Sequence, residues 1–135
     1  MITIKAEVIV SPNIIPEPDD HEIAAAWILA RHFNCKITFI KPLGGYKIKT
    51  PDIVMNNLEW EIKSPRGNKK RTIRNNLDLA KEQSPNIIID TRRTNLADNW
   101  IEAELNKQLH IKKGIFKIIM ISKDETVIEI PKKRK

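Results

Sequence analysis

The chain has 135 residues, 41% of them hydrophobic and 30% charged, a balance typical of one folded globular domain. Its 24 Lys and Arg outnumber its 17 Asp and Glu, and the resulting net charge of +7 favours an anionic partner, with nucleic acid the leading candidate. The single cysteine, Cys35, excludes an internal disulfide and argues against a cysteine-ligated zinc site, and no apolar run approaches the ~20 residues of a membrane span.

The first third of the chain predicts a strand, a helix and a second strand. Residues 2–10 alternate loosely between apolar and polar, and the charges of Lys5 and Glu7 exclude a signal-peptide apolar core. We therefore expect a cytoplasmic protein, or a module cut from a larger one, with residues 1–18 as an N-terminal extension. Asp19 or Asp20 would cap a helix over 20–33, and the β-branched run 36–40 would follow as a strand.

Residues 52–63 predict a β-hairpin with Asn56-Asn57 as a two-residue turn, because Asn tolerates the positive φ that such turns require. Paired residue numbers then sum to 113, and Asp52 comes to lie opposite Glu61. Alternation places the apolar side chains on one face, which we expect to be the core face: Ile53, Met55, Leu58, Trp60 and Ile62. The other face carries Asp52, Val54, Glu59, Glu61 and Lys63.

The second half alternates helices and strands. A basic helix is expected over 68–83, a strand buried on both faces over 86–90, and a third helix over 95–109. Strands over 115–121 and 126–130 would form a closing hairpin, followed by a basic, frayed tail over 131–135. The predicted order is (β)αβββαβαββ, a single α/β domain with a mixed sheet flanked by helices.

The facing carboxylates of Asp52 and Glu61 raise a chemical question. Like charges at directly opposed positions are destabilising, so either this face is well solvated or a cation lies between them. Two converging carboxylates suit Mg²⁺ or Mn²⁺. Lys63, one step further on the same face, would then lie beside the metal and orient a water or stabilise developing phosphate charge. The alternative is an ordinary solvated sheet face.

The spacing Pro51-Asp52, eight residues, then Glu61-Ile62-Lys63 resembles the PD-(D/E)xK nuclease superfamily, whose αβββαβ core matches the order predicted over residues 20–90. The segments TPDI at 50–53, WEIKSP-x-G at 60–67 and QSPNIIIDTRR at 83–93 resemble the C-terminal tRNA-nuclease toxin domains of CdiA-type contact-dependent inhibition proteins. Related modules occur in phage and mobile-element proteins. The resemblance covers about residues 20–121, and the helix and hairpin that follow the αβββαβ core would be C-terminal additions to it.

The resemblance implies roles for particular residues. Asp52 and Glu61 would hold the metal together with the Ile62 carbonyl, and Lys63 would be the catalytic lysine. The family also places an acidic residue on the first helix, where Glu22 fits as a further catalytic and metal-binding group. The alternative for Glu22 is a first-turn glutamate that favours the helix dipole.

Several basic residues are candidates for nucleic-acid contact. Four crowd the start of the second helix, and two follow the buried strand at the end where α/β sheets commonly place binding groups. These six are Lys69, Lys70, Arg71, Arg74, Arg92 and Arg93. Asp90 could orient one of the last two, and Tyr46 is a candidate for base stacking.

The predicted function is a metal-dependent endoribonuclease, a tRNA-cleaving toxin-like domain that uses Mg²⁺ or Mn²⁺. A potent tRNase implies a cognate immunity protein, and action in the cytoplasm after delivery as a toxin module. Two alternatives remain open: a non-catalytic nucleic-acid-binding module of a phage or mobile element, and a DNA nuclease of the same fold.

Overall fold

The computed structural model describes residues 5–14, 17–42 and 50–131. It forms one seven-stranded sheet whose strands follow their chain order, β1-β2-β3-β4-β5-β6-β7. Ten elements make up the fold: β1 (Glu7–Ile9), α1 (Asp20–Phe33), β2 (Lys36–Phe39), β3 (Ile53–Met55), β4 (Leu58–Lys63), α2 (Arg71–Ala80), β5 (Asn86–Asp90), α3 (Asp98–Ile111), β6 (Lys117–Ile121) and β7 (Val127–Ile130). The predicted α/β class and the predicted element order are both confirmed.

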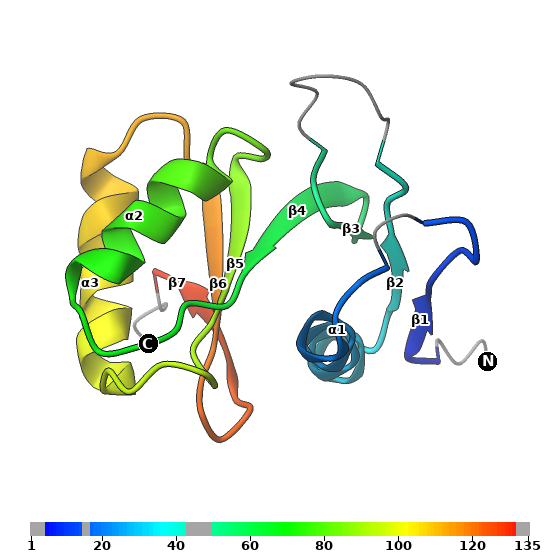
Figure 1. Ribbon diagram of the computed structural model, residues 1–135, viewed down its shortest axis with the longest axis horizontal. Helices are drawn as coiled ribbons and strands as arrows, with labels where there is room; N and C mark the ends of the chain where they lie inside the picture. The colour runs from blue at the N-terminus through cyan, green and yellow to red at the C-terminus, as the bar shows by residue number, and fades with distance from the viewer. Residues whose placement is uncertain (1–4, 15–16, 43–49, 132–135) are drawn as a thin grey trace.

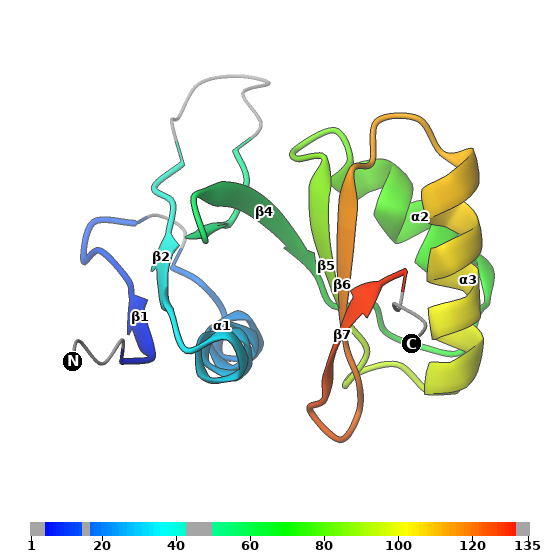
Figure 2. The ribbon, with the colours of Figure 1, turned by 180° about the vertical axis from the view of Figure 1, so that it is seen from behind.

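The sheet is mixed, with helices on both faces. Strands β1 and β2, β4 and β5, and β5 and β6 run parallel, whereas the other neighbours are antiparallel. Helix α1 lies on one side, beside β1 and β2, and α2 and α3 lie together on the other, with β4 spanning the distance between the two halves (Figures 1 and 2). The candidate residues on β4 therefore lie where the two halves meet.

Strand β5 shows how the two layers share the sheet. All five of its residues are buried, as its uninterrupted apolar sequence predicts. Ile88 belongs to the core under α1, whereas Ile87 and Ile89 belong to the core under α2 and α3. None of the helices among the described residues is both long and apolar enough to cross a bilayer.

The hairpin β3–β4 has the predicted register. Met55 pairs with Leu58, Val54 with Glu59 and Ile53 with Trp60. Asn56 and Asn57 have φ values of 52° and 66°, so both central residues are left-handed, as a two-residue hairpin turn requires. The turn chemistry thus determines which side chain opposes which along the hairpin.

Replacing Asn57 should reveal how much this turn contributes. Asn57→Gly should change the free energy of unfolding by less than about 0.5 kcal/mol, whereas Asn57→Val should lower it by about 1–2 kcal/mol, because a β-branched side chain clashes at positive φ. Urea denaturation of the two variants checks this. Equal stabilities would show that the turn does not require its left-handed backbone.

Several elements are shorter than predicted, and the N-terminal boundaries of β1, α2 and α3 differ most clearly. The expected strand 2–10 is β1, Glu7–Ile9, with residues 1–4 outside the described part. Helix α2 begins at Arg71 and α3 at Asp98, each three residues later than expected, because the preceding segments bind each other. Gly67 forms a bridge with Thr94, whose hydroxyl also donates to the Gly67 carbonyl at 2.7 Å. The tail beyond residue 131 and Tyr46 lie outside the described residues.

Candidate active site

The carboxyl groups of Asp52 and Glu61 lie together beside the end of β3. The Asp52 amide donates to the Trp60 carbonyl at 3.0 Å, which attaches Asp52 to β4 although Trp60 is already the pairing partner of Ile53. Asp52 Oδ2 accepts the Ile62 amide at 2.8 Å. The side chains of Asp52 and Glu61 are hydrogen-bonded to each other, so the structure brings together the two carboxyl groups that the hairpin register predicts to be neighbours.

Glu61 is deeply buried, which sequence reasoning did not predict. Its side chain is 4% exposed, and Oε1 has no hydrogen-bond partner among the described residues. Burial and, second, the Asp52 charge raise the pKa of Glu61 to about 8, although the Lys63 ammonium opposes the shift. Lys63 Nζ lies 3.4 Å from Glu61 Oε2. At neutral pH, therefore, Glu61 mainly retains a proton.

Asp52 has a different environment from Glu61. Burial raises its pKa, but the Ile62 amide, the hydrogen bond with Glu61 and the Lys63 charge all lower it. The pKa of Asp52 is raised overall, with this stabilisation of the anion limiting the rise. Two carboxyls in contact thus share a single site, in which the second negative charge is disfavoured without a further cation.

The donor set fits a hard divalent cation. Both side chains offer carboxylate oxygens, the ligands preferred by Mg²⁺ and Mn²⁺, and Glu61 Oε1 is a buried acceptor that lacks a donor. A cation would also offset the repulsion that raises the Glu61 pKa. The predicted third ligand, the Ile62 carbonyl, belongs to the residue between Glu61 and Lys63 on β4. Its role as a ligand stays a prediction.

Glu22 is near the pair but is engaged elsewhere. Its Oε1 accepts the Asp19 amide at 3.0 Å, so Glu22 caps the first turn of α1. Burial is the largest cause that raises its pKa, and the Asp52 charge also contributes, which places Glu22 within electrostatic reach of Asp52. The cluster of three potential ligands found in the described part of the chain is Asp19, His21 and Glu22, all within 4.8 Å. A direct role for Glu22 at the Asp52–Glu61 pair stays a prediction.

The basic residues of the second helix are exposed, as their proposed contact with a phosphate backbone requires. Four side chains reach the surface at or before the first turns of α2: Lys69, Lys70, Arg71 and Arg74. Lys70 Nζ also lies 5.4 Å from the centroid of the Trp100 ring, and Arg74 lies 3.9 Å from Glu104. Trp100 is consequently half-buried beneath a lysine.

Arg92 and Arg93 differ in their surroundings. Arg92 forms two side-chain hydrogen bonds to Asp90, Nε to Oδ1 at 2.9 Å and Nη2 to Oδ2 at 2.7 Å. Asp90 thus orients Arg92, one of the two arginines that the sequence suggested. Arg93 is half-buried and forms no ion pair within the described residues. The contacts of this network with α1 and β4 were missed, because no local pattern joins residues so distant in the chain.

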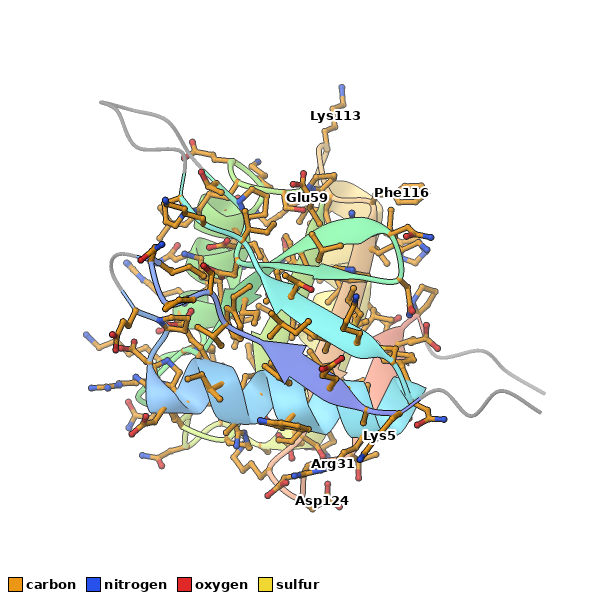
Figure 3. All side chains as sticks on the ribbon, turned by 90° about the vertical axis from the view of Figure 1, so that its right-hand side faces the viewer. Lys5, Arg31, Glu59, Lys113, Phe116 and Asp124 are labelled. Carbon is orange, nitrogen blue, oxygen red and sulfur yellow. The ribbon has the colours of Figure 1, made fainter. Side chains whose placement is uncertain are left out.

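Other features lie apart from the acidic pair. A cavity of about 540 Å³ is lined by Trp60 and by residues of β6 and β7, and contains none of the predicted metal ligands. Glu59, on the same strand face as Glu61, is exposed and lies at the end of the molecule that also carries Lys113 and Phe116 (Figure 3). Glu59 is therefore a suitable control for Glu61.

Comparisons with known proteins agree with this arrangement at the level of family and fold. Residues 49–127 match the family model of the contact-dependent growth inhibition CdiA C-terminal domain, and these residues include the hairpin, α2, β5, α3 and β6. A similar solved structure is the CdiA-CT/CdiI toxin and immunity complex from Burkholderia pseudomallei, with a TM-score of 0.57 and 18% identity over 92% of this chain and 98% of that one. No curated protein sequence matches the chain. Because the family model spans more than half of its residues, the chain belongs to the CdiA C-terminal domain family of contact-dependent growth inhibition.

Proposed function

We propose that this chain is a metal-dependent endoribonuclease of the PD-(D/E)xK type, a contact-dependent inhibition toxin domain that hydrolyses phosphodiester bonds of tRNA. The observation that carries the proposal is the buried contact between Asp52 and Glu61 beside Lys63, with a Glu61 oxygen that lacks a donor. Membership of the CdiA C-terminal domain family supports the toxin role.

Asp52 and Glu61 would hold one Mg²⁺ or Mn²⁺ ion, with the Ile62 carbonyl and Glu22 as additional candidates. When bound, such an ion activates water and polarises a phosphoryl oxygen. The protein must also release the Glu61 proton for both carboxylates to act as ligands, because metal ligands bind in their deprotonated form. The site should consequently be more competent near pH 8 than near pH 6.

Lys63 would act as the catalytic lysine. Its ammonium is about one-quarter exposed and 3.4 Å from Glu61, so it lies at the edge of the buried pair and remains accessible to a substrate. There it would orient the attacking water and stabilise negative charge that develops on the phosphate oxygens. The exposed basic residues of α2 would bind the RNA backbone on either side of the reacting phosphate.

A cognate immunity protein and action in the cytoplasm of a target cell complete the proposal. The similar structure from Burkholderia pseudomallei is a complex of toxin and immunity proteins, which supports a corresponding partner for this chain. The toxin would act where tRNA is found. Co-expression with such a partner should accordingly be needed for high yield of the active protein.

Cleavage of total tRNA tests the proposal. Purified protein should produce discrete fragments with Mg²⁺ or Mn²⁺ at pH 8, and EDTA should prevent their formation. Single-stranded and duplex DNA incubated in parallel distinguish the DNA nuclease, since cleavage of DNA with intact tRNA would select that alternative. If RNA and DNA both stay intact under every condition, and binding depends on salt but not on Mg²⁺, the chain is the non-catalytic binding module.

A further inference from the structure

The ion pair between Asp90 and Arg92 links the end of β5 to α1 and β4, the two elements that carry Glu22, Glu61 and Lys63. We propose that Asp90 and Arg92 are positioning residues, which hold the first turn of α1 and the end of β4 together, and that Arg92 is not a contact for the RNA backbone. This inference rests on the proposed function, and it reverses the role that the sequence suggests for Arg92.

The contacts centre on the fully buried carboxylate of Asp90. Asp90 is 0% exposed at the end of β5 and accepts the Nε and Nη2 hydrogens of Arg92, as well as the Arg92 amide at 3.1 Å. Ser64 Oγ donates to Asp90 Oδ2 at 3.3 Å. Arg92 Nη2 also donates to the His21 carbonyl at 3.2 Å. One carboxylate and one guanidinium therefore link β5, the end of β4 and the start of α1.

The bonded groups are immediate neighbours of the proposed catalytic residues. Ser64 directly follows Lys63, and His21 directly precedes Glu22. A shift of either backbone would move the lysine or the glutamate with it. The bidentate pair can therefore control the distance between Lys63 and the start of α1. This distance matters because catalytic groups must be held within about 0.5 Å of their productive geometry.

The same contacts make Arg92 a poor binder of phosphate. Its Nε and Nη2 donors are used within the protein, its charge is neutralised by Asp90, and its side chain is 21% exposed. The adjacent Arg93 has no ion-pair partner within the described residues. Arg93 is thus the matched control, since it adjoins Arg92 and remains a candidate for contact with the RNA backbone.

Two variants separate positioning from RNA contact. Arg92→Lys keeps the charge but cannot form the bidentate pair. The double variant Asp90→Asn/Arg92→Gln removes both charges, so it leaves no buried ion unpaired and remains informative if Arg92→Lys proves unstable. In the catalytic assay, both should lower kcat at least 10-fold and leave KM for RNA within about 2-fold.

Two readouts do not depend on cleavage. RNA binding is measured in a Lys63→Ala background, which prevents cleavage. Changing Arg92 should leave the Kd for RNA within about 2-fold and the salt dependence of binding unchanged. Arg93→Gln should instead weaken binding and lower the salt slope by about 1. Amide chemical shifts in ¹H–¹⁵N spectra should change at His21–Glu22 and at Lys63–Ser64 in both Arg92 variants.

Three results would overturn the inference: weaker RNA binding with a lower salt slope in the Arg92 variants, spectral changes confined to residues 90–93, or an unchanged kcat in an active enzyme. If the wild-type protein cleaves no RNA, the proposed function fails. The spectra still decide whether Asp90 and Arg92 position α1 and β4, so the two failures are distinguishable.

Discussion

Lys63→Ala should lower kcat for RNA cleavage by about 10³-fold, while KM changes by less than about 3-fold. The ammonium lies 3.4 Å from Glu61 and at the edge of the carboxylate pair, so its removal deprives the reacting phosphate of a positive charge. It also removes the charge that lowers the pKa of Glu61, which should move the rate profile to higher pH. Single-turnover cleavage measured from pH 6 to 9 checks both effects.

Lys112 provides a matched control for this experiment. It too is a partly buried lysine that pairs with a carboxylate, 2.6 Å from Asp78, but it lies at the end of α3. Lys112→Ala should retain the wild-type rate. If Lys63→Ala also retains it, or if both variants lose the same fraction of activity, Lys63 has no catalytic role.

Glu61→Gln should stabilise the metal-free protein at pH 8 by about 2–5 kcal/mol. Because the folded-state pKa of Glu61 is raised from 4.5 to about 8, the folded protein binds a proton that the unfolded chain releases between those values. The free energy of unfolding therefore falls as pH rises from about 4.5 to 8 and levels above that range. Glutamine is neutral at every pH, so the variant should lose much of this slope.

Chemical denaturation in EDTA at pH 5 and pH 8 measures the difference. The exposed Glu59 is the control, and Glu59→Gln should change stability by less than about 0.5 kcal/mol at both values. A wild-type protein as stable at pH 8 as at pH 5, with Glu61→Gln no more stable, would contradict the buried, protonated state of Glu61. Glu61→Gln should lose RNA cleavage even though it is more stable. Glu61 would then be a residue that catalysis requires at a cost to the stability of the fold.

The hairpin was predictable because its determinants are local. Two asparagines form a two-residue turn, and the register that follows pairs Ile53 with Trp60, which makes Asp52 and Glu61 the next residues along the two arms of the hairpin. The buried β5 was equally plain from its continuous apolar sequence. Such features depend on neighbouring residues and need no knowledge of the rest of the fold.

The burial of Glu61 was not predictable in the same way. Alternation assigns Glu61 to the charged face with Glu59, yet Glu61 is buried and Glu59 is exposed. The difference arises because β4 passes from the edge of the hairpin into the centre of the sheet, where β5 and the helices surround it (Figure 1). Burial that arises from such tertiary contacts produces no periodic pattern of apolar residues in the sequence.

The late helix starts and the Asp90–Arg92 network have a similar cause. Residues 67 and 94 pair across 27 positions of chain, and the Arg92 bond to His21 spans 71. Propensity favours helix over these segments, but the bonds between them favour irregular backbone. Long-range hydrogen bonds thus shortened two predicted helices and engaged one predicted RNA contact within the protein.

Calorimetric titration with Mn²⁺ tests most directly whether Asp52 and Glu61 form a cation site. The wild-type protein should bind one ion at pH 8, release close to one proton when titrated at pH 7, and bind about 10-fold more weakly at pH 6.5 than at pH 7.5, because Glu61 must lose its proton. Glu59→Gln should behave as wild type, whereas Asp52→Asn and Glu61→Gln should lose binding. Absence of binding in the wild-type protein, or equal binding in Glu61→Gln, would contradict the account.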